Sequence, residues 1–201
     1  MKIKICGLFR KEDIDYINEA RPDYIGFVFA ESRRQISRSK ASRLRSRLAQ
    51  GIRPVGVFVD APIGEITGLF SDGIIEIAQL HGSEDEAYIA QLKRMCEVEI
   101  IKTIIYPLCG HCEMEKYNNA DYYLIDSGAG SGKTFDWNSL TGIKINKPWF
   151  LAGGINSDNM EKAISLNPFA IDISSGAETN GIKDREKIIH LSILAKKGKS
   201  I

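Results

Sequence analysis

The stretch Leu124–Trp137 (LIDSGAGSGKTFDW) joins an apolar run to a carboxylate and then to a glycine-rich segment. Asp126 ends the apolar run, as expected where a buried strand delivers a charged group to a site. The glycines that follow would let the backbone approach a ligand or turn tightly. Two chemistries fit this stretch: nucleotide phosphate binding by the loop, or acid–base work by Asp126 within a larger site.

The phosphate-binding pattern G-x-x-x-x-G-K-[ST] is nearly met at Ser127–Thr134. Ser127 stands where the first glycine belongs, however, and the segment FDW that follows does not open a long apolar helix. We therefore interpret Gly128–Thr134 as a flexible loop that covers a substrate rather than as a nucleotide site.

Cys6 is the most informative thiol because it ends the apolar run Ile3–Cys6 directly before Gly7. A cysteine in a buried strand is most often an inert apolar filler. Lys4 shares a strand face with Cys6, and a nearby ammonium would favour the thiolate. Such a perturbation suits a general base that works near neutral pH.

Asp126 and Asp172 both come at the ends of apolar runs. A buried carboxylate without a partner is costly, so one interpretation is a satisfied ion pair, with Lys4 or Lys102 as the partner. The other is a carboxyl group whose pKa is raised enough to donate a proton. The sequence alone leaves both open.

Short apolar runs alternate with amphipathic segments along the whole chain, and this order predicts an α/β fold, a single-domain (β/α)₈ TIM barrel over residues 1–201. A doubly wound open sheet is the alternative. The sixth unit has room for only a short helix, at Trp137–Gly142. The predicted strands are Ile3–Cys6, Tyr24–Phe29, Val55–Val59, Ile75–Leu80, Val98–Ile104, Tyr122–Asp126, Trp149–Ala152 and Ala170–Ser174. The predicted helices include Lys11–Ala20, Ser39–Ala49, Glu84–Arg94, Asp158–Ser165 and Asp184–Lys196.

Helix starts carry local signals. Ser83 and Glu86 have the spacing of a capping box, and Ser37, Asn156 and Asp184 are predicted N-caps.

Polar residues gather at the carboxyl ends of the predicted strands, and strand alternation places them on common faces. Lys4 pairs in this way with Cys6, Gln79 with His81, and Asp172 with Ser174. Active sites of such barrels are built at this end.

Two segments after the seventh and eighth strands predict a phosphate site. Leu151–Asn156 (LAGGIN) and Asp172–Gly176 (DISSG) offer small residues and backbone N–H groups. Barrels often bind a phosphate between these two loops, which implies a phosphorylated substrate.

Cys109-Gly110-His111-Cys112 matches the tetrapeptide of disulfide-exchange enzymes. No thioredoxin-like frame surrounds it, and no second pair of ligands has metal-site spacing. We expect Cys109 and Cys112 to be an exposed pair of thiols in a loop. We expect the four cysteines of the chain to be free thiols rather than a disulfide framework, and we expect no metal site.

The composition excludes several partner classes. With a net charge of +1 and a pI near 7.6, the chain lacks the excess of positive charge that is typical of proteins that bind nucleic acid or an anionic membrane. No apolar run reaches membrane-span length, and a signal peptide is absent, so we expect a cytoplasmic protein.

These motifs, in their order and spacing, resemble the phosphoribosylanthranilate isomerase family of tryptophan biosynthesis. The resemblance spans the whole chain. It rests on KICG at Lys4–Gly7, IGFVFAESRRQIS at Ile25–Ser37, PVGVFVD at Pro54–Asp60, QLHG at Gln79–Gly82, LIDSGAGSGKTFDW, LAGGIN and DISSGAETNGIKD at Asp172–Asp184.

The resemblance implies an Amadori rearrangement of a small phosphoribosyl substrate without a cofactor, by a protein expected to be monomeric with no obligate partner. Asp126 would be the general acid and Cys6 the general base. The implied substrate-binding residues are Arg34, for the anthranilate carboxylate, with Gln79, His81 and Asp172. The implied phosphate-binding residues are Gly153, Gly154, Ser174, Ser175 and Gly176.

Two positions depart from the family pattern: Phe9 replaces a usual threonine, and Glu31 a frequent proline. The alternative functions are a phosphosugar-binding barrel that has lost catalysis, with Phe9 as its mark, and a thiol-exchange module based on Cys109 and Cys112.

Overall fold

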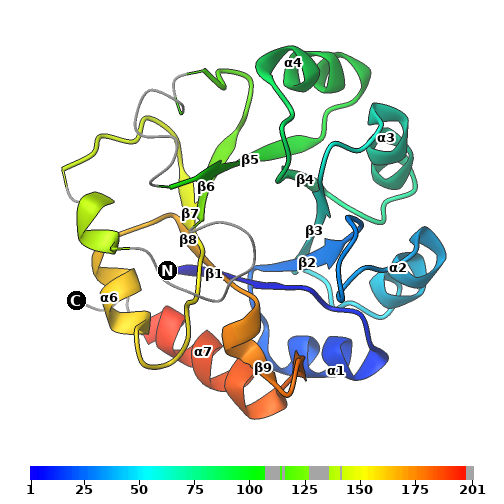
Figure 1. Cartoon of the computed structure of the whole chain (residues 1–201). Coiled ribbons are helices and arrows are strands. Elements are labelled where there is room, and N and C mark those ends of the chain that lie inside the picture. The colour runs from blue at the N-terminus through cyan, green and yellow to red at the C-terminus, as the bar shows by residue number, and fades with distance from the viewer. Residues whose placement is uncertain (107–113, 115, 127–135, 141, 198–201) are drawn as a thin grey trace.

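The computed structural model describes residues 1–106, 114, 116–126, 136–140 and 142–197. Eight parallel strands form a closed barrel in which each strand pairs with its neighbours in sequence and β1 pairs with β8. Helices surround the strands (Figure 1). The predicted (β/α)₈ fold is confirmed. The strands are β1 (Lys2–Cys6), β2 (Tyr24–Val28), β3 (Arg53–Phe58), β4 (Ile77–Leu80), β5 (Glu99–Ile105), β6 (Tyr122–Asp126), β7 (Trp149–Leu151) and β8 (Ala170–Ile173).

The described helices follow the strands around the outside of the barrel. They are α1 (Lys11–Ala20), α2 (Arg38–Arg45), α3 (Ile63–Ser71), α4 (Glu86–Met95), η1 (Trp137–Leu140), α6 (Met160–Ser165), η2 (Ser175–Ala177) and α7 (Arg185–Lys197). The short helix expected in the sixth unit is confirmed as η1, whereas α3 is a helix that the sequence pattern did not predict. None of the described helices is both long and apolar enough to cross a membrane.

Boundaries of the elements were predicted less well than their order. β4 begins at Ile77, because the amides of Ile74 and Ile75 bond back to the carbonyl of Leu69 at the end of α3. α2 ends at Arg45, since the following turns tighten to i→i+3 hydrogen bonds.

Two predicted helix starts are confirmed and two are wrong. Ser37 accepts a hydrogen bond from the Lys40 amide, and Asp184 accepts from the amides of the first turn of α7. The start of α4 is capped by Asp85, not by Ser83, because the Asp85 carboxylate accepts from the Tyr88 amide. The Ser83 amide bonds to Asp60 rather than to Glu86, so the predicted capping box does not form.

At α6 the N-cap is Asn159 rather than Asn156. The side chain of Asn156 accepts from the amide of Asp158, so it closes a turn before the helix begins.

Inside the barrel, an apolar floor closes the end opposite the carboxyl ends of the strands. Because strand residues alternate between faces, every second residue points inward. Phe150 lies at the centre, with edge-on ring contacts to Tyr24, Tyr122 and Phe169 at centroid distances of 5.5, 5.8 and 5.8 Å. The buried members of this floor are Tyr24, Val55, Ile77, Ile101, Leu124, Phe150, Ala152 and Ala170.

A small hairpin lies between β8 and α7. Strands β9 (Glu178–Thr179) and β10 (Ile182–Lys183) pair antiparallel across Asn180 and Gly181. Both turn residues have positive φ, of 52° and 81°. This geometry is that of a two-residue hairpin turn, for which Asn-Gly is a favoured sequence.

We expect Phe150→Ala to lower the free energy of unfolding by about 3–5 kcal/mol, because it removes a fully buried ring and leaves a cavity in the floor. Chemical denaturation would measure the change. The matched control is Ile193→Ala in α7, whose side chain is exposed and whose loss should cost no more than about 0.5 kcal/mol. Equal losses in the two variants would contradict the assigned role of the floor.

Candidate active site

A cavity of about 200 Å³ opens at the carboxyl ends of the strands. Every site residue predicted from the sequence lines this cavity except Gly176. Gly176 lines a neighbouring surface pocket, together with Gly154 and Ser175, which line both. The predicted residues on the cavity wall are Cys6, Arg34, Gln79, His81, Asp126, Gly153, Gly154, Asp172, Ser174 and Ser175.

A buried ion pair lies directly above the apolar floor. Lys4 of β1 and Asp172 of β8 are register neighbours, and their Nζ and Oδ2 atoms are 2.8 Å apart. Lys4 also donates to Oε1 of Gln79 in β4, at 2.8 Å. Burial is the largest single effect and alone would lower the pKa of Lys4, but the charges of Asp172 and Cys6 and the hydrogen bonds to both together raise it. The ammonium therefore stays charged inside the barrel.

The second oxygen of Asp172 has no hydrogen-bond partner among the described residues, although it is buried. An unsatisfied buried acceptor costs free energy. Since Asp172 lines the cavity, a ligand N–H or O–H group in the cavity would satisfy this atom.

His81 stands beside Asp126 at the mouth of the barrel, with Nε2 and Oδ2 3.4 Å apart. The tautomer of His81 follows from its neighbours. Lys4 can only donate, so Gln79 turns its carbonyl to Lys4 and its amide nitrogen to Nδ1 of His81, at 3.3 Å. In the neutral ring Nδ1 therefore accepts and Nε2 carries the proton, which points toward Asp126.

Of the two ion pairs considered for the carboxylates, one forms and one does not. Asp172 pairs with Lys4, whereas Lys102 pairs with Glu84 at 3.0 Å and does not contact Asp126. Asp126 instead faces Nε2 of His81, at 3.4 Å.

Cys6 is buried at the end of β1 and is a free thiol. Burial raises the pKa of its thiol above the ordinary 9.0, and the charge of Asp172 adds to this effect. Lys4 and Lys183 act in the opposite direction but do not overcome burial. Lys4 therefore does favour the thiolate, as predicted, yet the net shift is upward.

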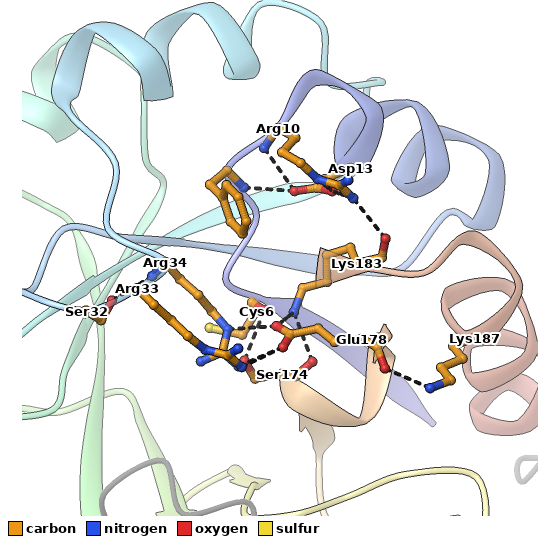
Figure 2. A network of polar contacts seen from close by, with 11 residues as sticks. Cys6, Arg10, Asp13, Ser32, Arg33, Arg34, Ser174, Glu178, Lys183 and Lys187 are labelled. Carbon is orange, nitrogen blue, oxygen red and sulfur yellow. Dashed lines mark hydrogen bonds and ion pairs between the residues drawn. The ribbon is translucent and has the colours of Figure 1, made fainter. Parts of the chain in front are cut away.

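Arg34 reaches the cavity from the segment after β2 and crosses directly over the residue that follows Cys6. A Cβ atom at Gly7 would lie 2.3 Å from Cδ of Arg34, and Gly7 has φ +84°. Only glycine allows this approach. Two nitrogens of the guanidinium, Nε and Nη2, donate to Glu178 at 2.7 and 3.0 Å (Figure 2).

The two loops of the predicted phosphate site pack against each other. Gly153 and Gly154 have positive φ, and a Cβ at Gly176 would lie 1.9 Å from the carbonyl oxygen of Ile155. The backbone of the β8 loop thus touches that of the β7 loop. Asn159 donates to the carbonyl of Gly154 at 3.0 Å and helps to fix the loop.

The two departures from the family pattern lie beside the site. Phe9 packs against the outer core, and its amide donates to Asp13 at 3.0 Å. Glu31 is exposed. Neither residue lines the cavity.

Two sequence predictions lie outside the described residues: the loop at Gly128–Thr134, and the thiol pair Cys109 and Cys112. Within the part of the chain that is described, no group of three or more His, Cys, Asp or Glu side chains could hold a metal ion.

Several polar contributors to the site were missed, among them Ser32, which lines the cavity. Thr103 of β5 lies 3.3 Å from Nδ1 of His81, and Glu178 and Lys183 hold Arg34 and the end of β8. Strand alternation within β5 could have identified Thr103. The Asn180-Gly181 dipeptide could have identified the hairpin that carries Glu178 and Lys183.

The fold and the cavity together define a barrel enzyme with a thiol and carboxylates at its strand ends and paired glycine-containing loops after β7 and β8. The model of the N-(5'-phosphoribosyl)anthranilate (PRA) isomerase family matches residues 3–192. The chain belongs to this family. The predictions of an enzyme, of an isomerase and of a place in tryptophan biosynthesis are confirmed with it.

Curated relatives and solved structures agree with the family. The isomerase of Endomicrobium trichonymphae is 45% identical over 199 residues, and that of Clostridium acetobutylicum is 43% identical over 198; each alignment covers 94% of both chains. The crystal structure of the enzyme from Thermus thermophilus superposes with a TM-score of 0.88 at 30% identity, over 98% of this chain and 99% of that chain. A PRA isomerase in complex with reduced 1-(o-carboxyphenylamino)-1-deoxyribulose 5-phosphate superposes with a TM-score of 0.83 at 29% identity, over 98% and 99%.

The upward shift of the Cys6 pKa has a measurable consequence. We expect the rate of iodoacetamide alkylation of Cys6 in the free protein to keep rising with pH beyond the ordinary thiol value of 9.0, because burial disfavours the thiolate. Mass spectrometry of the Cys6 peptide would follow the reaction. Cys96, which is half-buried outside the site, provides the internal comparison. If the alkylation rate of Cys6 reached half its maximum below pH 9.0, the conclusion that burial raises the pKa of this thiol would be wrong.

Proposed function

We propose that this chain converts N-(5-phosphoribosyl)anthranilate to 1-(2-carboxyphenylamino)-1-deoxyribulose 5-phosphate with Asp126 as general acid and Cys6 as general base. The observation that carries these roles is that both groups line one cavity from different sides. Asp126 ends β6 and Cys6 ends β1, with β7 and β8 between them on the shorter path around the barrel. A substrate in the cavity therefore lies between the two groups.

The first step opens the ribose ring. Asp126, protonated, gives its proton to the ring oxygen as the bond from that oxygen to C1 breaks, and the nitrogen lone pair forms the C1 iminium. Asp126 then becomes a carboxylate, which the Nε2–H of His81 stabilises. His81 thus assists the acid without taking a proton itself.

The second step moves the double bond. The iminium withdraws electrons and acidifies the C2–H bond, so the Cys6 thiolate can remove that proton. The C–H electrons form the C1–C2 double bond of an enolamine, and the iminium nitrogen becomes an amine. Loss of the C2 hydroxyl proton and protonation at C1 then give the ketone. No net oxidant or reductant is needed, because the reaction is an isomerisation.

Binding groups are available for each part of the substrate. The guanidinium of Arg34 suits the anthranilate carboxylate. The unpaired oxygen of Asp172 suits the substrate N–H. The loops that contain Gly153, Gly154 and residues 174–176 suit the terminal phosphate. The complex of a family member with the reduced product supports a site of this kind.

For Gln79 and His81 we propose a second role besides substrate binding: they orient the carboxyl group of Asp126. Gln79 bonds to Lys4 and to His81, and His81 faces Asp126. Both residues line the cavity, so they can touch the substrate while they orient the acid.

The remaining features follow from the same proposal. The chain works as one domain, without a cofactor, metal or protein partner, and in the cytoplasm. The closed barrel and the family match over residues 3–192 support one domain. The barrel that carries the proposed site residues closes within one chain, which is in line with an active monomer. Size-exclusion chromatography with light scattering would contradict the monomer if activity eluted only with a larger assembly.

A non-catalytic phosphosugar-binding barrel is the alternative, and the site does not favour it. Phe9, the residue that suggested this alternative, lies outside the cavity, while the acid and the base both line it. Expression in a tryptophan auxotroph that lacks this isomerase is expected to restore growth.

We expect Cys6→Ser and Asp126→Asn each to lower turnover by about 10²–10⁴-fold, because each removes one partner of general acid–base catalysis. Loss of the anthranilate fluorescence of the substrate would measure turnover. Near-normal turnover in either variant would remove that residue from the mechanism.

Cys96→Ser is the matched control, since Cys96 lies outside the cavity and its thiol donates to the carbonyl of Leu92. It should retain full turnover. Unchanged thermal unfolding of the Cys6 and Asp126 variants would show that the losses are chemical.

A further inference from the structure

The β9–β10 hairpin places a buried carboxylate, Glu178, behind the active-site arginine. Figure 2 shows Glu178 at the centre of a polar network that reaches Arg33, Arg34 and Lys183. The side chain of Glu178 is 3% exposed, and it does not line the cavity. The proposed chemistry assigns nothing to this residue.

Both oxygens of Glu178 are fully used. Oε1 accepts from Nε of Arg34 and from Nζ of Lys183, each at 2.7 Å. Oε2 accepts from Nη2 of Arg34 at 3.0 Å and from Nη2 of Arg33 at 2.8 Å. One buried carboxylate thus meets three cations, and two of its four contacts form the fork of a bidentate guanidinium pair.

This arrangement keeps Glu178 ionised. Burial alone would raise the pKa of the carboxyl, but the hydrogen bonds from Arg34 and Lys183 and the charges of these two residues together lower it. A charged carboxylate with fixed cations around it is a rigid anchor, because any movement would separate buried opposite charges.

Arg34 needs such an anchor. Its long side chain has many rotamers, so ordering it costs conformational entropy. The fork with Glu178 fixes the guanidinium plane, and the stem lies against Gly7. Nη1 makes no hydrogen bond within the described residues and remains available to a ligand in the cavity that Arg34 lines.

Lys183 extends the network to the other end of the site. Its buried Nζ donates to Glu178 and also, at 2.9 Å, to the carbonyl of Ser174 at the start of the β8 loop. The same hairpin therefore contacts the arginine for one end of the substrate and the loop for its phosphate.

We propose that Glu178 is a positioning residue that orients Arg34 toward the aromatic carboxylate of the substrate, with Lys183 tying this anchor to the phosphate loop. The inference rests on the proposed role of Arg34 in binding that carboxylate. It assigns Glu178 no contact with substrate and no part in proton transfer.

A double-mutant cycle between Glu178→Gln and Arg34→Ala tests the proposal. Gln keeps the size of Glu but removes the charge that holds the fork. We expect Glu178→Gln to raise KM by about tenfold with little change in kcat, because binding is lost equally in ground and transition states. In the Arg34→Ala background, Glu178→Gln should have no further effect on KM.

Arg33→Ala is the matched control. Arg33 binds the same carboxylate, but its side chain is 57% exposed and does not line the cavity. Its loss should leave KM within about twofold of the parent enzyme. If Glu178→Gln fails to fold by circular dichroism, Glu178→Asp, which keeps the charge on a shorter stem, replaces it in the cycle with a smaller expected rise in KM.

A phosphoribosyl-aniline substrate, which lacks the aromatic carboxylate, separates positioning from a structural role. With this substrate the Glu178 variant and the parent enzyme should show the same KM. An equal penalty with both substrates, or additive effects of the two mutations, would overturn the proposal.

The outcomes also separate this inference from the proposed function. If Arg34→Ala leaves KM unchanged, the carboxylate-binding role of Arg34 is wrong, and the inference falls with it. If Arg34→Ala raises KM while Glu178→Gln does not, the role of Arg34 stands and only the inference is overturned.

Discussion

The buried pair of Lys4 and Asp172 is the interaction on which the rest of the site depends. Two charges inside a barrel cost several kcal/mol each to desolvate, so neither is tolerable without the other. Their register positions on β1 and β8, the strands that close the barrel, place them side by side. A second hydrogen bond of Lys4, to Gln79, brings β4 into the same cluster.

The local electrostatics of the proposed base and acid follow from this pair. Burial, together with the charge of Asp172, raises the pKa of the Cys6 thiol against the opposing effect of Lys4, so the thiolate is a strong base once it forms. On the other side Gln79, oriented by Lys4, fixes the tautomer of His81 and hence the N–H that faces Asp126. The base and the acid are thus linked through one lysine without contacting each other.

The sequence predicted those parts of the fold and site that depend on local pattern. Alternation within a strand placed Gln79 with His81, and Lys4 with Cys6, on common faces. The bounds of β6 were predicted to the residue, because its apolar run ends abruptly at Asp126. The α4 cap failed for the opposite reason: Ser83 has the right spacing, but a distant residue, Asp60, takes its amide.

What the sequence could not predict depends on contacts between distant segments. Glu178 and Arg34 are 144 positions apart, so no periodicity links them. The direction of the Cys6 pKa shift could not be predicted for the same reason. Strand alternation predicted that Lys4 lies on the same face as Cys6, but the burial that outweighs the effect of Lys4 depends on the closed barrel.

The rearrangement constrains the site at both ends of its substrate. The bond that opens and the proton that leaves belong to adjacent carbons, C1 and C2, so the sugar must lie with one carbon near each reacting group. A site that held only the phosphate would leave the aromatic end free to turn C2 away from Cys6. Fixing the aromatic carboxylate as well removes that rotation. The hairpin contacts both Arg34 and the Ser174 carbonyl, so it links the two groups that are proposed to hold the two ends of the substrate.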